Sequence, residues 1–122
     1  MSLDPLFHKE YDDKDYNCAH LFCDIWKIKT GDDVSGVLSG LLTDEENRRI
    51  DYKTRHYFEP CEKPHSPCMI EMQASNQAPH VGFYNDGYVM QITKQGVQNQ
   101  PLEISTRGFK EIKYYRKKTH DN

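Results

Sequence analysis

The chain has 122 residues and a formal net charge of −3, with 36% hydrophobic, 11% aromatic and 29% charged residues. Its length predicts one domain, residues 1–122, that buries its own core, and its aromatic content excludes a disordered chain. The negative net charge argues against nucleic acid as a partner. No apolar run approaches the roughly 20 residues that span a bilayer, so we expect no membrane partner either.

The first 16 residues are acidic and irregular, and Asp12, Asp13 and Asp15 lie close together before the first cysteine. They contain no apolar segment of a signal peptide, so we expect synthesis in the cytoplasm and reduced cysteines. Two interpretations of the acidic group stay open. It is either an exposed loop or a carboxylate patch beside a binding cleft.

The best helix pattern follows, in the stretch DYNCAHLFCDIW. Apolar residues recur at helical spacing from Ala19, with Asn17 as N-cap and Gly31 as the stop. Residues 32–50 favour two further short helices, although Gly36 and Gly40 weaken the first of them.

The next stretch, YFEPCEKPHSPC, contains three prolines and is predicted to be a loop. After it the period changes to two, and the runs CMIEMQ, HVGFYND, GYVMQIT and FKEIKYYR predict strands. The tripeptide Asn85-Asp86-Gly87 predicts a tight hairpin between the second and third runs. Helices followed by antiparallel strands predict an α+β domain, with N-terminal helices packed on a small antiparallel sheet.

Cys18 falls in the first turn of the predicted helix. Free N–H groups and the positive end of the helix dipole stabilise a thiolate there, whereas the nearby aspartates oppose it. Cys18 is therefore either a buried core residue or a nucleophile. Cys23 lies further along the helix and is expected to be a core residue.

A cysteine nucleophile needs a base, normally a histidine. His80 opens a predicted strand, and the hairpin returns the chain so that Gln91 lies beside it. The side-chain oxygen of Gln91 can accept a hydrogen bond from the imidazole and fix its tautomer. A single histidine on a strand is more often structural, but the three residues together favour a catalytic group.

A rival group is His56, Cys61, His65 and Cys68, which offers four zinc ligands. Its spacings do not match the close Cys-x-x-Cys and His-x-x-x-His pairs of familiar zinc modules. We therefore expect no metal and no cofactor.

With NCAHLFCDIW, PCMIEM, HVGFY and a polar residue on the following strand, the chain resembles the NlpC-type papain-like cysteine peptidases over about residues 11–116. The likeness is strongest to short cell-wall peptidases of phage and prophage tails. It implies the papain-like fold, with Cys18 as nucleophile, His80 as general base and Gln91 as the orienting residue. The implied activity is hydrolysis of amide bonds in peptidoglycan stem peptides.

The resemblance also implies residues for substrate and oxyanion binding. An upstream tyrosine is a family feature, for which Tyr11 and Tyr16 are the candidates, and Asn17 and Ala19 flank the nucleophile. Wall-remodelling members commonly carry Asp-Cys-Ser-Gly at this place, and histidine is common where this chain has Gln91. The implied partners are peptidoglycan peptides and phage tail proteins, and the implied place of action is the bacterial cell wall. The alternative is a non-catalytic tail assembly protein that keeps the fold.

Overall fold

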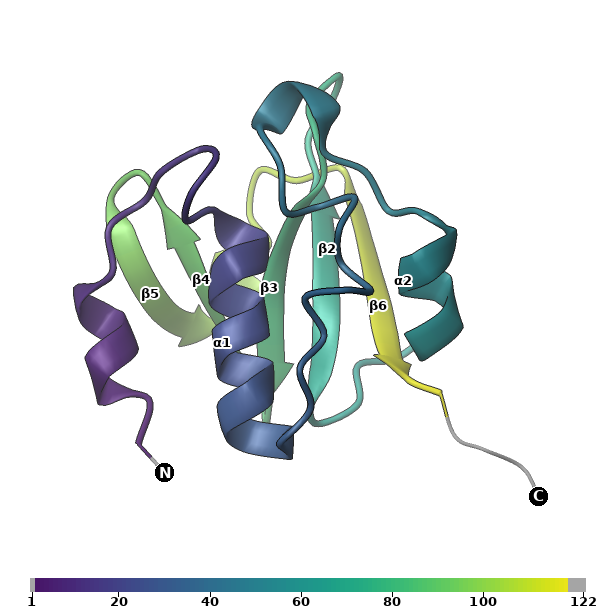
Figure 1. Ribbon diagram of the computed structural model, residues 1–122, viewed down its shortest axis with the longest axis horizontal. Helices are drawn as coiled ribbons and strands as arrows, with labels where there is room; N and C mark the ends of the chain where they lie inside the picture. The colour runs from purple at the N-terminus through teal and green to yellow at the C-terminus, as the bar shows by residue number, and fades with distance from the viewer. Residues whose placement is uncertain (1, 119–122) are drawn as a thin grey trace.

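Six strands form one sheet in the order β1-β6-β2-β3-β4-β5, and every neighbouring pair is antiparallel (Figure 1). The computed structural model describes residues 2–118. α1 lies across one face of the sheet, and the protein is an α+β domain with few helices, as predicted. The elements in chain order are η1 (Asp4–His8), α1 (Cys18–Thr30), η2 (Glu45–Asn47), α2 (Tyr52–Tyr57), β1 (Phe58–Cys61), β2 (Cys68–Gln73), β3 (His80–Asn85), β4 (Tyr88–Thr93), β5 (Gly96–Pro101), α3 (Leu102–Ser105) and β6 (Glu111–Lys117).

α1 begins and ends where the sequence predicts. The side-chain oxygen of Asn17 accepts hydrogen bonds from the N–H groups of Ala19 and His20, and the N–H of Asn17 donates to Nδ1 of His20 at 3.0 Å. This reciprocal capping satisfies donors that the first turn cannot pair internally. Gly31 ends the helix in the left-handed conformation, with φ of 86°, where a residue without Cβ is favoured.

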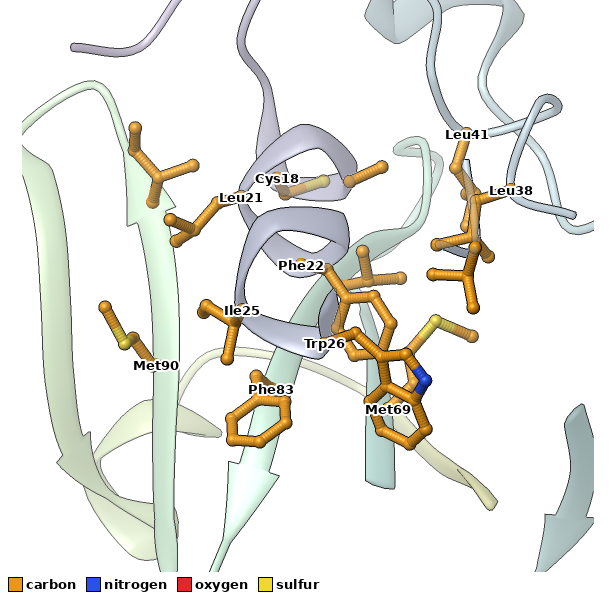
Figure 2. Packing of buried hydrophobic residues seen from close by; sticks show 14 of the residues in the cluster. Cys18, Leu21, Phe22, Ile25, Trp26, Leu38, Leu41, Met69, Phe83 and Met90 are labelled. Carbon is orange, nitrogen blue, oxygen red and sulfur yellow. The ribbon is translucent and has the colours of Figure 1, made fainter. Parts of the chain in front are cut away.

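The main core lies between α1 and the sheet. Four large side chains of α1 are buried there, and Figure 2 shows them facing the strands: Leu21, Phe22, Ile25 and Trp26. The ring of Trp26 lies 5.3 Å from that of Phe58 and 6.2 Å from that of Phe83, measured between centroids. Edge-to-face aromatic packing of this kind fixes the helix on the sheet, and with it the position of Cys18 in the first turn.

The four strands expected in the second half are confirmed as β2, β3, β4 and β6. Asp86 and Gly87, with φ of 49° and 88°, form the tight turn between β3 and β4. Two positive φ angles match the right-handed twist of the hairpin strands, as the sequence predicted.

The prediction of two short helices in residues 32–50 is wrong for the first and only partly right for the second. Residues 35–41 form turns, and η2 is a short 3-10 helix. At Gly40 the chain folds back against itself: the N–H of Arg49 donates to the Gly40 oxygen at 2.7 Å. A Cβ on Gly40 would lie 2.6 Å from the Arg49 oxygen, so this close approach requires glycine.

The predicted loop YFEPCEKPHSPC is also partly wrong, because Phe58–Cys61 forms strand β1. β1 is an edge strand that pairs only with β6, and an edge strand tolerates Pro60 because one of its sides needs no N–H donor. α2, β5 and α3 were not predicted. Within residues 2–118, no helix has the length and apolar character that crossing a membrane requires.

Candidate active site

The first turn of α1, the start of β3 and the second half of β4 bring Cys18, His80 and Gln91 together. Nε2 of His80 lies 2.5 Å from Oε1 of Gln91. The ladder between β3 and β4 covers Phe83–Asn85 and Tyr88–Met90, so His80 and Gln91 lie beyond its paired part. There the two polar side chains bond to each other. With Nε2 engaged by Gln91, Nδ1 is the imidazole nitrogen left for Cys18.

The imidazole is also held from one side by an aromatic ring that the sequence reasoning missed. The ring of Phe109 stacks on that of His80, with centroids 6.0 Å apart and planes at 5°. Phe109 follows α3 and precedes β6, so nothing in its local sequence indicates this contact. The stacking and the bond to Gln91 together restrict the imidazole to one orientation.

The electrostatics of the Cys18–His80 pair favour its charged form. Burial raises the pKa of Cys18, but interactions with His80 and Arg48 and the backbone of Val81 outweigh it, so that this pKa lies below the ordinary value. Burial lowers the pKa of His80, but Cys18 and Gln91 outweigh it, so that this pKa lies above the ordinary value. Both shifts favour transfer of the proton from the Cys18 thiol to the His80 imidazole.

The other three cysteines have the opposite shift. Burial raises the pKa of Cys23 and of Cys68 to about 12, and it raises that of Cys61 as well. Cys18 is therefore the one cysteine of the four whose surroundings favour a thiolate.

This contrast predicts selective alkylation. At about pH 6, iodoacetamide is expected to label Cys18 ahead of Cys23, Cys61 and Cys68, because an unperturbed thiol with a pKa of ~8.5 is almost fully protonated there. The labelled positions are read from peptide masses after digestion of the protein. Labelling of Cys18 at the same rate as Cys61 or slower would support a core cysteine instead.

Arg48, which the sequence analysis did not single out, completes the surroundings of Cys18. Its Nη1 lies 3.6 Å from the sulfur of Cys18, and its Nη2 lies 3.1 Å from a carboxylate oxygen of Asp13. Arg48 follows η2 and is separated from both partners by 30 residues or more along the chain. The acidic group before Cys18 thus reaches the site indirectly, through an ion pair of Asp13 with Arg48.

The other two aspartates of that group do not contact Arg48. The carboxylate of Asp12 accepts hydrogen bonds from the N–H groups of Lys14 and Asp15, and Asp15 is exposed. Asp12 therefore stabilises the turn that leads into α1.

The two candidate tyrosines occupy different places. Tyr11 lines the cleft beside His80, and its hydroxyl donates to Asp13 at 3.3 Å. The hydroxyl of Tyr16 donates to Asp24 at 2.5 Å, and its ring stacks on that of His20. Of the two, Tyr11 is the one that a molecule in the cleft would meet.

Asn17 and Ala19 are both buried completely. The side-chain NH₂ of Asn17 donates to the carbonyl oxygens of Leu41 and Thr43, at 3.4 and 2.8 Å, while its oxygen caps α1. The N–H of Ala19 is used in that cap. Asn17 therefore joins α1 to the segment before η2. Through the helix cap, Asn17 and Ala19 fix the position of Cys18, which lies between them in the chain.

A cleft of about 410 Å³ opens beside His80. The residues that line it come from separate parts of the chain and include Tyr11, Arg48, His80, Gln91, Ile104 and Phe109. Cys18 is 1% exposed, and the guanidinium in contact with its sulfur also lines this cleft. A larger hollow of about 640 Å³ shares Glu45, Arg48, Gln77 and Ala78 with the cleft, so the two adjoin at Arg48.

The rival zinc group does not gather in the part of the chain that the structure describes. In residues 2–118, no three histidine, cysteine or acidic side chains lie close enough together to hold a metal ion. Cys61 contacts the carbonyl oxygen of Tyr114, and His65 contacts Arg116. These two side chains therefore point to partners on β6.

No protein family model, curated protein or solved structure matches this chain.

Proposed function

We propose that the protein is a cysteine peptidase that hydrolyses amide bonds in bacterial peptidoglycan stem peptides and that acts as part of a phage or prophage tail. The observation that carries the chemistry is the arrangement at the N-terminus of α1. A cysteine with a lowered pKa lies beside a histidine with a raised pKa, and that histidine bonds to Gln91 at 2.5 Å. Three such groups in this order are what nucleophilic catalysis by cysteine requires.

The reaction proceeds through an acyl-enzyme. The Cys18 thiolate attacks the amide carbonyl carbon, an S–C bond forms, and the π electron pair moves to the oxygen. When this pair returns, the C–N bond breaks and the His80 imidazolium gives its proton to the leaving amine. Water then attacks the thioester while His80 takes its proton, and the thiolate leaves. Gln91 holds the imidazole with Nδ1 towards Cys18 throughout.

The oxyanion needs hydrogen-bond donors near the sulfur. The cap of α1 uses the N–H groups of Ala19 and His20, and no hydrogen bond from the N–H of Cys18 occurs among the described residues. The N–H of Cys18 is thus a donor for the oxyanion at the positive end of α1.

Two parts of this proposal rest on the sequence resemblance: the papain-like, NlpC-type fold and the cell-wall substrate. The order of elements agrees with that fold: a cysteine at the start of a helix, followed by histidine and a third polar residue on adjacent antiparallel strands. The cleft beside His80, of about 410 Å³, falls in the size range of ligand sites in proteins and so has room for part of a peptide.

The burial of Cys18 favours a second candidate, a non-catalytic tail assembly protein that keeps this fold. At 1% exposure, its sulfur is covered until Arg48 or its neighbours move. A relic of an enzyme can keep its polar group without turnover.

Incubation with defined muropeptides separates the two candidates. Purified protein is expected to cleave an amide bond of the stem peptide, with products identified by mass spectrometry, and Cys18→Ala is expected to produce none. The same products at the parental rate from the Cys18→Ala protein would contradict the peptidase proposal. Failure of the parent protein on stem peptides of both common wall types, with Cys18 shown to be reactive, would support the non-catalytic candidate.

A further inference from the structure

Arg48 is held over the sulfur of Cys18 by a fixed set of contacts. It is 8% exposed, and its Nη2 pairs with Asp13 at 3.1 Å. Asp13 in turn accepts hydrogen bonds from the Tyr11 hydroxyl at 3.3 Å and from the Glu45 N–H at 3.0 Å. The guanidinium is thus fixed from behind, and Nη1 points to the sulfur at 3.6 Å.

One donor of this guanidinium has no partner. Among the buried side-chain nitrogen and oxygen atoms of the described residues, Nε of Arg48 alone lacks a hydrogen bond. Leaving a buried donor unpaired destabilises a fold, so an arginine kept here needs an explanation other than stability. Arg48 lies between the cleft and the sulfur of Cys18, and this position supplies such an explanation.

We propose that Arg48 is a catalytic residue that stabilises negative charge at the reacting atoms, first on the Cys18 sulfur and then on the carbonyl oxygen. The proposal rests on the cysteine peptidase function above. When the thiolate attacks and the S–C bond forms, the charge moves from sulfur to oxygen, and the Nη1 hydrogen bond moves with it. Collapse of this intermediate returns the electron pair to the carbonyl, breaks the C–N bond and transfers the His80 proton to the amine.

The sequence resemblance implies a tyrosine hydroxyl near the oxyanion. The hydroxyl of Tyr11, however, donates its hydrogen bond to Asp13. Arg48 therefore takes the role that was expected for a tyrosine hydroxyl. It binds the oxyanion together with the N–H of Cys18. A guanidinium is suited to this role because it stays charged at every accessible pH and carries several donors in one plane.

The groups that face Cys18 are the N-terminus of α1, His80 from β3 and Arg48 from the segment after η2, with Asp13 and Tyr11 behind Arg48. Arg48 and the protonated form of His80 both favour the thiolate. His80 loses its charge as the pH rises, and Arg48 does not. Removal of Arg48 is therefore expected to raise the pKa of Cys18 by about one unit, the lower end of what one nearby opposite charge contributes.

The test uses the full chain and the pH dependence of Cys18 alkylation by iodoacetamide. Arg48→Gln is expected to move the midpoint of this dependence upward by about one unit, and Arg48→Lys by less because it keeps a charge. Arg49→Gln is the matched control: it removes the same charge from the next, exposed residue and is expected to leave the midpoint unchanged. The midpoint is the readout because the loss of Arg48 also uncovers the sulfur and raises the maximal rate.

An unchanged midpoint in folded Arg48→Gln overturns the proposal, and so does an equal shift in Arg49→Gln. On a muropeptide that the parent cleaves, Arg48→Gln is expected to lower kcat more than the reduced thiolate fraction explains, with KM little changed. If no muropeptide is cleaved but the midpoint shifts, the peptidase proposal fails while the charge stabilisation by Arg48 stands.

Discussion

Alanine at Cys18 or at His80 is expected to remove nearly all cleavage of a muropeptide, on the order of 10³-fold or more, whereas Gln91→Ala leaves measurable activity. Loss of the nucleophile removes the covalent route. Loss of the base leaves the amine without a proton donor. Gln91→Ala is expected to lower turnover roughly 10- to 100-fold, a part of what general acid–base catalysis contributes.

The smaller effect at Gln91 follows from its contacts. Gln91 accepts from Nε2 of His80 at 2.5 Å and does not itself transfer a proton. Without it, the imidazole keeps its stacking on Phe109 but spends less time in the tautomer that faces Cys18. Gln91→His is expected to retain activity, because histidine also bonds to the imidazole.

Gln95→Ala is the matched control for Gln91→Ala. Gln95 is an exposed glutamine between β4 and β5 that bonds to Thr93, so its loss is expected to leave turnover unchanged. Turnover is measured from product masses over time, and circular dichroism checks that each variant is folded. Parental activity in Gln91→Ala would remove Gln91 from the site, and parental activity in Cys18→Ala would end the enzyme proposal.

The proximity of Cys18, His80 and Gln91 could be predicted from the sequence because each has a local signal. Asn17 and the apolar spacing after it fix where α1 starts, so Cys18 falls in its first turn. The turn at Asp86-Gly87 sets the hairpin and so brings His80 near Gln91. Short-range rules of capping and turn geometry suffice for both.

Arg48 and Phe109 could not be found in this way. Both reach the site through contacts between segments distant in the sequence, and neither lies in a periodic pattern. The path of residues 32–50 decides where Arg48 lies, and that path depends on the close approach at Gly40. β5 was missed for a related reason: its residues, GVQNQP, are mostly polar and have weak strand propensity by themselves.

Asn17 is the residue whose loss is expected to destabilise the protein most among the polar groups of the site. Asn17→Ala is expected to lower the free energy of unfolding by about 3 kcal/mol, since it removes a helix cap worth ~1 kcal/mol and leaves buried carbonyls unpaired at ~1–3 kcal/mol. Those carbonyls belong to Leu41 and Thr43. Urea unfolding of each variant measures the change.

Asp51→Ala provides the control for the cap alone. Asp51 caps α2 by accepting from the N–H groups of Lys53 and Thr54, and its side chain joins no other segment in the described hydrogen bonds. Its replacement is expected to cost ~1 kcal/mol. Equal losses in Asn17→Ala and Asp51→Ala would show that the contacts of Asn17 to Leu41 and Thr43 contribute nothing.

Asn17→Asp tests why this chain has asparagine before its cysteine. Aspartate caps helices as well as asparagine does, so the cap by itself predicts no loss. The NH₂ group of Asn17, however, faces the carbonyl oxygens of Asp13, Leu41 and Thr43, at 3.2, 3.4 and 2.8 Å. A carboxylate oxygen there has no donor to meet and brings a buried charge against three acceptors. Asn17→Asp is therefore expected to be at least as unstable as Asn17→Ala.

The loss of stability in Asn17→Asp is expected to shrink at low pH, where a protonated aspartic acid donates to one of these carbonyls. Parental stability of Asn17→Asp at neutral pH would contradict this account of the link between α1 and the segment that carries Arg48.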